Sequence, residues 1–100
     1  EENFGPMLQV QFVDTFEDAI EAANNTKYGL AAGLISDNKN LFNEFVDRVN
    51  AGVINFNSTT TGASGAFPFG GIGRSGNLRP AGYYAADYCA WPKASIIKQL

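Results

Sequence analysis

The fold is decided by residues 30–56, which read LAAGLISDNKNLFNEFVDRVNAGVINF. Residues 30–36 are short, apolar and glycine-containing, as in a buried strand, and residues 53–56 form a second run of this kind. Between them, Asp37-Asn38 can cap a helix whose apolar residues recur at helical spacing. Those apolar residues are Leu41, Phe42, Phe45, Val46 and Val49. The order strand, helix, strand predicts a parallel pair of strands joined by a right-handed crossover.

Upstream of this unit, the sequence predicts a further strand and a further helix. Residues 7–13 alternate, with Leu8, Val10 and Phe12 on one side, as in a half-buried strand. Thr15 is a good helix cap, with Asp18 three residues later and acidic charge in the first turn. The helix that follows shows one apolar face, made of Phe16, Ala19, Ile20 and Ala23. Asn24-Asn25 and Gly29 stop this helix.

Downstream, a glycine-rich loop is expected from about residue 57 to residue 80. A helix is expected over residues 81–90, where Trp91-Pro92 breaks it, and residues 94–100 are a candidate terminal strand. The predicted fold class is therefore α/β: a strand-helix-strand-helix-strand unit, then a long glycine-rich loop, a helix and a terminal strand.

Composition excludes several classes of function. The 100 residues form one small domain or a piece of a larger one, and a net charge of −3 offers no basic footprint for nucleic acid. There is no histidine and one cysteine, so neither histidine general-base chemistry nor a zinc site is expected, and no metal ligands are assigned. No membrane span or signal peptide is visible, so a cytoplasmic location is expected. The start at Glu1, without Met, suggests an internal cut in a longer protein.

Two motifs are set aside on physical grounds. Residues 71–76 match the dinucleotide pattern G-x-G-x-x-G, but that fingerprint must follow a strand and open a helix. Pro68-Phe69-Gly70 precedes it and Pro80 falls where the helix should run, so we interpret it as a tight turn. Cys89 has no histidine or nearby lysine to lower the pKa of its thiol, so we expect an inert core residue.

Residues 61–64 read Thr-Gly-Ala-Ser and are the most informative part of the glycine-rich loop. Gly62 frees the backbone, while Thr61 and Ser64 offer hydroxyl groups. Successive backbone amides here can form a concavity that binds a carboxylate. The alternative is an ordinary solvated loop.

Three motifs, in order and spacing, together resemble the carboxy-terminal part of an aldehyde dehydrogenase, and the resemblance covers essentially the whole chain. They are Glu2-Asn3-Phe4-Gly5-Pro6, the run 24–34 with Tyr28-Gly29-Leu30-Ala31-Ala32, and Phe67-Pro68-Phe69-Gly70-Gly71. Further stretches resemble a bacterial branch of this family that oxidises an acidic semialdehyde during arginine breakdown. They include Thr61-Gly62-Ala63-Ser64, Ser75-Gly76-Asn77 and residues 83–90.

The resemblance implies an NAD-dependent oxidation of an aldehyde to an acid, with a cysteine nucleophile and a glutamate general base. In the family's pattern neither of these catalytic residues falls within this chain, and nor does the cofactor-binding domain. No catalytic residue is therefore assigned here, and the chain alone is expected to be inactive. Residues 1–92 correspond to part of the catalytic domain and residues 93–100 to a strand that joins subunits.

The resemblance also assigns roles to residues of this chain. Glu2 matches the glutamate that accepts hydrogen bonds from the nicotinamide ribose of NAD, and Phe4 matches an aromatic beside the nicotinamide ring. Phe69 matches an aromatic of the aldehyde channel. Thr61, Gly62 and Ala63 match the loop that anchors a distal carboxylate of the substrate. The expected partners are an acidic small-molecule aldehyde and further copies of the chain, with no nucleic acid and no membrane.

Two alternatives stay open. The first is another semialdehyde dehydrogenase with a different acidic substrate. The second belongs to another class of function: a non-catalytic binding or assembly module built on the same fold. A cysteine in an apolar, glycine-flanked context upstream of Glu1 would favour an enzyme over a module.

Overall fold

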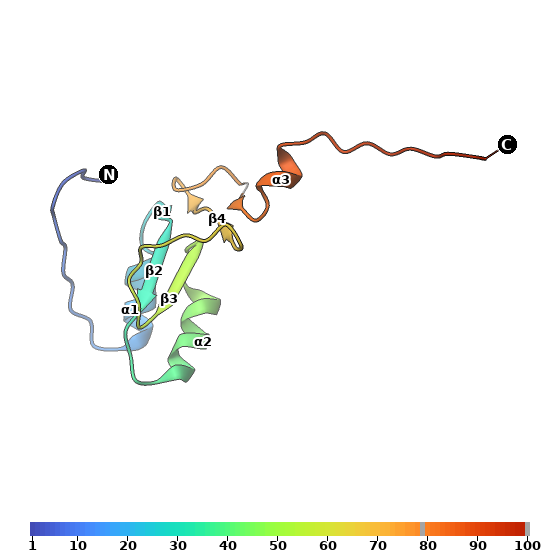
Figure 1. Ribbon diagram of the computed structural model, residues 1–100. Coiled ribbons are helices and arrows are strands. Elements are labelled where there is room, and N and C mark those ends of the chain that lie inside the picture. The colour runs from blue at the N-terminus through green and yellow to red at the C-terminus, as the bar shows by residue number, and fades with distance from the viewer. Residues whose placement is uncertain (79, 100) are drawn as a thin grey trace.

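The computed structural model describes residues 1–78 and 80–99 and shows a small mixed body with an extended segment at each end (Figure 1). The helices are α1 (Phe16–Asn24), α2 (Lys39–Arg48) and the short α3 (Ala85–Tyr88). The strands are β1 (Tyr28–Gly29), β2 (Ala31–Leu34), β3 (Val53–Phe56), β4 (Pro68–Phe69), β5 (Ile72–Gly73) and β6 (Ala81–Gly82). The predicted helix, strand, helix and strand are present from α1 to β3, with the two-residue strand β1 added before β2.

The pair β2–β3 is the centre of this body. It is parallel, and its register runs from Ala31 opposite Val53 to Leu34 opposite Phe56. The ladder continues one residue further, because the amide of Asn57 donates to the carbonyl of Leu34 at 2.8 Å. The predicted parallel pair is therefore confirmed, with α2 as the connection between its strands.

The core lies on one face of this pair. Its buried members are Ile20 from α1 and Phe45 and Val49 from α2. They pack against partly buried apolar residues of both helices, of both strands and of the turn before β3: Phe16, Ala32, Leu34, Phe42, Ala51 and Ile54. The strand β2 is only half-buried, since Ala31 and Gly33 are exposed while Ala32 and Leu34 are covered. The strand that we expected within residues 30–36 is therefore present at 31–34, but the expectation that it is buried holds for only one of its two faces.

Both long helices begin where capping predicts. The hydroxyl oxygen of Thr15 accepts a hydrogen bond from the amide of Asp18 at 3.1 Å. At the start of α2, the side-chain oxygen of Asn38 accepts from the amide of Asn40 at 3.0 Å. Each cap satisfies an amide that the first helical turn leaves without an intrahelical partner.

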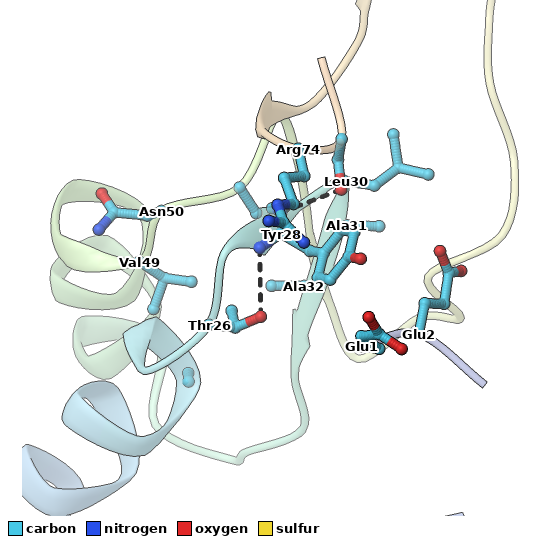
Figure 2. A pocket seen from close by; sticks show the side chains of 14 residues that line it. Glu1, Glu2, Thr26, Tyr28, Leu30, Ala31, Ala32, Val49, Asn50 and Arg74 are labelled. Carbon is cyan, nitrogen blue, oxygen red and sulfur yellow. Dashed lines mark hydrogen bonds between the residues drawn. The ribbon is translucent and has the colours of Figure 1, made fainter. Parts of the chain in front are cut away.

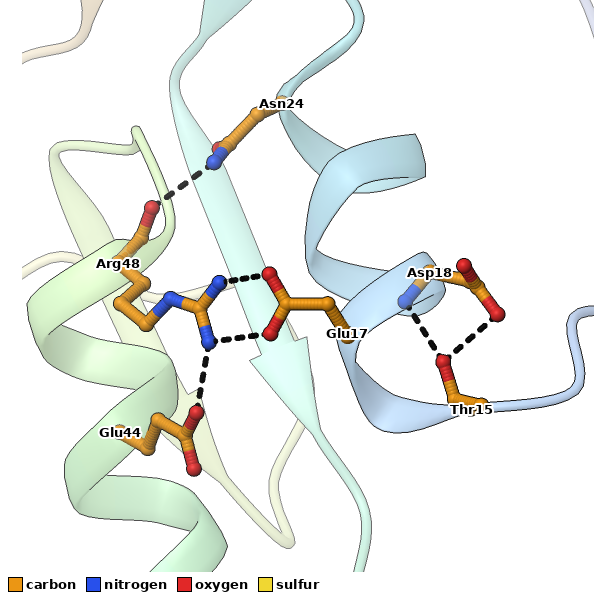
Figure 3. Close-up of polar contacts among 6 residues, drawn as sticks. All are labelled: Thr15, Glu17, Asp18, Asn24, Glu44 and Arg48. Carbon is orange, nitrogen blue, oxygen red and sulfur yellow. Dashed lines mark hydrogen bonds and ion pairs between the residues drawn. The ribbon is translucent and has the colours of Figure 1, made fainter.

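Polar side chains join α1 to α2 at the surface (Figure 3). Arg48 forms a two-bond ion pair with Glu17 and a second ion pair with Glu44, one turn earlier on its own helix. Asn24 donates to the carbonyl of Arg48 and accepts from the amide of Asn50, both at 2.8 Å. Asn24 thus links the end of α1 to the end of α2 and to the turn that leads into β3.

Residues 57–80 were expected to form a glycine-rich loop without strands. The structure places the short strands β4 and β5 within it. β5 pairs with β1, and β4 pairs with β6, both antiparallel. Residues 74–76 turn directly after β5, with hydrogen bonds from Ser75 to Ile72 and from Gly76 to Gly73, and no helix opens there. The tight-turn interpretation of residues 71–76 is confirmed.

Three other expectations are corrected. Residues 7–13 form no strand, and Leu8 and Phe12 are 85% and 95% exposed, because no described segment pairs with them. The helix expected over residues 81–90 shrinks to α3, since Gly82 has φ 66° and residues 81–82 pair with β4 instead. Cys89 is exposed and is not a core residue.

The terminal segment is extended but unpaired. Residues 94–99 form no strand with any described part of the chain, and Ile96 and Ile97 are exposed. Leu100, the last residue of the expected strand, lies outside the described residues. Within residues 1–78 and 80–99, no helix is long and apolar enough to span a bilayer, and no cluster of three or more acidic or sulfur side chains could hold a metal.

The close approach of Gly52 to Gly70 generates the first testable prediction. A Cβ on Gly52 would overlap the carbonyl of Gly70, whereas a Cβ on Gly65 would meet nothing within 4 Å. Gly52→Ala should therefore cost about 1–3 kcal/mol of overpacking and lower the apparent Tm of the whole protein. Gly65→Ala should leave Tm nearly unchanged. Equal Tm values for the two variants would contradict the close packing of these backbones.

The ion pair of Glu17 with Arg48 generates a prediction about pH. Hydrogen bonds from Arg48 hold the pKa of Glu17 below its ordinary value of 4.5. The ion pair therefore stabilises the fold fully above about pH 4.5, and this contribution is lost as pH falls through the lower folded pKa. Glu17→Gln should lower Tm at pH 7, and the difference from wild type should shrink towards pH 3.

The matched control is Glu21→Gln, which removes the same charge from an exposed position of the same helix. Its Tm difference from wild type should be smaller at pH 7. A Glu17→Gln difference that grows as pH falls would have the wrong sign for this ion pair.

Candidate functional site

One cavity collects most of the residues that the carboxylate hypothesis names. It has a volume of about 390 Å³ and lies between the start of β3, the loop 62–64 and the segment that carries β4. We call it the anchor cavity. Its lining residues are Gly52, Val53, Asn55, Gly62, Ala63, Ser64, Phe67, Pro68 and Phe69.

Local backbone chemistry explains the course of this loop. Gly62 has φ 110°, a conformation that residues with a side chain rarely adopt. A Cβ added at this position would meet no atom within 4 Å. Two residues on, Ser64 closes a turn: its carbonyl accepts from the amide of Phe67 at 3.1 Å and its hydroxyl accepts from the amide of Ala66 at 3.2 Å. The turn carries the chain from the loop into β4, where Phe69 enters the same cavity.

Hydrogen bonds also fix the first half of the loop. The side-chain amide of Asn55, on β3, donates to the carbonyl of Thr59 at 2.6 Å. The hydroxyls of Thr59 and Thr61 share a hydrogen bond of 2.9 Å. Asn57 adopts φ 49°. Its side-chain oxygen accepts from the amide of Ser36 at 2.9 Å, and its side-chain nitrogen donates to the carbonyl of Ser36 at 2.8 Å. The loop thus leaves β3 along a fixed path.

The polar side chains that line the anchor cavity are those of Asn55 and Ser64, and the rest of its described lining is apolar or glycine. Each carries a neutral donor: an amide in Asn55 and a hydroxyl in Ser64. A carboxylate in this cavity would be held by neutral donors and backbone amides, while an aromatic such as Phe69 would pack against an apolar carbon chain.

The structure brings only part of the predicted substrate site together. Gly62, Ala63 and Phe69 line the anchor cavity. Thr61 does not line it, and its hydroxyl shares a hydrogen bond with that of Thr59. Sequence reasoning missed Asn55, although a signal was present: it is the one polar residue in the apolar run 53–56. A polar side chain at such a position alternates away from the core and must find a polar partner.

A second, larger cavity of about 510 Å³ holds Glu2, the predicted ribose-binding residue (Figure 2). Glu1 and Glu2 from the N-terminal segment lie near residues from α1 to β2 and near Arg74 and Ser75 after β5. The hydroxyl of Ser75 accepts from the amide of Gly29 at 3.1 Å, and that of Thr26 accepts from the amide of Tyr28 at 3.2 Å. The wall beside Glu2 is therefore held by one hydrogen bond within the turn 26–28 and one between β1 and the turn after β5.

The chemistry of Glu2 and Phe4 can be compared with what a nicotinamide cofactor requires. The carboxylate of Glu2 borders an open cavity. It can accept hydrogen bonds from two hydroxyl groups at once, which suits the two hydroxyls of a ribose. Phe4 is 94% exposed, so its ring face is free to pack on a flat ring, but it does not line the same cavity. The residue types fit the group, although the structure does not bring Glu2 and Phe4 into one cavity.

Comparison with known proteins shows which protein family this chain resembles. Residues 1–94 match the sequence model of the aldehyde dehydrogenase family. Over 96 residues the chain is 59% identical to N-succinylglutamate 5-semialdehyde dehydrogenase 2 of Caulobacter vibrioides, covering 96% of this chain and 20% of the relative. The chain thus spans about a fifth of the length of the curated relatives it matches.

Solved structures agree with this result. A salicylaldehyde dehydrogenase from Pseudomonas putida, complexed with salicylaldehyde, superposes with a TM-score of 0.81 at 28% identity, over 88% of this chain and 18% of that one. An aldehyde dehydrogenase from Bacillus cereus, in complex with NAD⁺, gives a TM-score of 0.76 at 39% identity, over 84% and 17% of the two chains.

Proposed function

Because the chain belongs to the aldehyde dehydrogenase family, we propose that the whole protein is an NAD-dependent dehydrogenase that oxidises N-succinylglutamate 5-semialdehyde to N-succinylglutamate in arginine catabolism. The proposal extends to a cytoplasmic location and to assembly into a homo-oligomer through the terminal strand 93–100. On this proposal residues 1–92 are part of the catalytic domain, and the chain by itself does not turn over substrate.

The anchor cavity is the observation that carries the choice of substrate. The proposed substrate bears carboxylates far from its aldehyde group, and the cavity places neutral donors and an aromatic wall around one space. The names of relatives at 55–59% identity support the same substrate. Neutral donors are sufficient for a carboxylate, because a hydrogen bond with one charged partner is worth about 1.5–3 kcal/mol.

The residues of this chain would bind and orient, and the bond-breaking groups are expected elsewhere in the whole protein. Bound NAD would supply the acceptor for a hydride from the substrate carbon. Glu2 would accept hydrogen bonds from the ribose hydroxyls and so orient the nicotinamide end, and Phe4 would pack beside the ring. Phe69 would line the aldehyde channel, and Gly62 and Ala63 would present backbone amides to the distal carboxylate. Thr61, which pairs with Thr59, would support that loop.

The alternatives make different predictions. Another acidic-semialdehyde dehydrogenase would prefer a different carboxylate-bearing aldehyde in a substrate panel. A non-catalytic module would reduce no NAD with any aldehyde. Steady-state assays of the whole protein across aldehydes with and without distal carboxylates separate these cases.

The anchor loop yields a prediction about specificity. Gly62→Val would strain a backbone at φ 110° and obstruct the loop amides. In the whole enzyme, kcat/KM for the acidic substrate should fall far more than kcat/KM for its neutral diamide of the same size. The control Gly65→Val changes an open position of the same loop and should leave both values nearly unchanged. Equal losses on the two substrates in Gly62→Val would mean that the loop is structural only.

Glu2 yields a prediction about the cofactor. Glu2→Gln removes a charged acceptor and should lower the hydride-transfer rate or raise KM for NAD by about ten- to a hundredfold, the size of a charged hydrogen bond. Glu1→Gln borders the same cavity and removes the same charge, and it should have little effect. Pre-steady-state NADH formation measures both variants. If Glu2→Gln behaved like Glu1→Gln, the ribose-binding role would have to be abandoned.

A further inference from the structure

We propose that Asn55 is the positioning residue that sets specificity for the substrate carboxylate, by tethering the anchor loop to β3. This inference rests on the proposed function. It adds to that function a residue outside the predicted substrate site, on a regular strand and not on the loop.

Asn55 lies on the face of the sheet that is turned away from the core. Asn55 stands opposite Gly33 in the β2–β3 register, between Ile54 and Phe56. Successive strand residues face opposite sides, and Ile54 faces the core, so Asn55 faces away from it. Gly33, across the register, lets the loop lie close to this face, because a Cβ on Gly33 would meet the side chain of Thr60 at 3.3 Å and the carbonyl of Ser58 at 3.6 Å. Asn55 lines the anchor cavity beside that loop.

A chain of hydrogen bonds connects Asn55 to the loop. Its side-chain nitrogen donates to the carbonyl of Thr59 at 2.6 Å. Thr59 in turn shares its hydroxyl with Thr61 at 2.9 Å, immediately before Gly62. A strand residue therefore reaches, through two hydrogen bonds, the point where the loop begins to line the cavity.

Gly62 and Gly65 leave this part of the loop conformationally free. Nothing lies within 4 Å of the side that a Cβ of Gly62 or Gly65 would occupy, so packing does little to hold this stretch. Glycines also add backbone freedom, which must be restricted if amides are to converge on an anion. The bond from Asn55 restricts the loop close to that stretch. Without it, the amides of Gly62 and Ala63 would be less well preorganised for a carboxylate.

The test uses the whole enzyme and Asn55→Leu, which removes the amide at nearly constant volume. For N-succinylglutamate 5-semialdehyde, KM should rise about tenfold while kcat stays within about twofold, the pattern of lost binding that is equal in ground and transition states. For the neutral diamide of the same aldehyde, KM should change by less than about threefold. Asn43→Leu makes the same chemical change at an exposed position of α2 and should leave both KM values unchanged.

Hydrogen exchange of the segment 58–66 provides a second readout that does not depend on turnover. Asn55→Leu should speed exchange there about tenfold and Asn43→Leu should not. If Asn55→Leu folds poorly, Asn55→Ser replaces it, because its side chain stays polar but is too short to reach Thr59. Unchanged exchange at 58–66 would overturn the tether. Equal rises of KM for acid and diamide would overturn the specificity role. A wild type that oxidises neither aldehyde would refute the proposed function instead, and the exchange result would still decide the tether.

Discussion

The parallel register of β2 with β3 is the constraint on which the rest of the structure depends. It places Ala32 beside Ile54 and Leu34 beside Phe56, so that one face of the pair meets Ile20, Phe45 and Val49. A slip of one residue would turn that face towards solvent and is excluded by the burial it would lose. The same register sends Asn55 to the opposite face. One alternation therefore builds both the core and a wall of the anchor cavity.

Close backbone contacts then attach the glycine-rich segment to this unit. A side chain on Gly52 would overlap Gly70, one on Gly76 would overlap Gly71, and one on Gly73 would overlap the carbonyl of Lys27. These glycines are required because main chains meet there, which is a different reason from phosphate binding. The letters G-x-G-x-x-G can thus arise from the packing of a turn against β1, and their context decides which cause applies.

What the sequence could predict follows from how local each interaction is. Thr15 and Asn38 cap their helices through amides two or three residues away, so the pattern alone places both helix starts. The apolar alternation of residues 7–13 predicts that one side of this segment is covered, but it does not indicate which segment covers it. No described segment pairs with residues 7–13. The helix expected from residue 81 failed for a non-local reason: Gly82 packs on the carbonyl of Phe67, and β6 pairs with β4.

The candidate site shows the same division. The loop 61–64 is visible in the sequence as a cluster of small and hydroxylated residues. Asn55 stands out in the sequence only as a polar residue in an apolar run, and its partner Thr59 is known only from the structure. This difference has a physical consequence for specificity. Neutral donors bind a carboxylate well only when they are held in place beforehand, since each donor that must be ordered on binding subtracts from the gain. A loop rich in glycine gains such order when a side chain of the sheet holds it, and the hydrogen bond from Asn55 to the carbonyl of Thr59 is a contact of that kind.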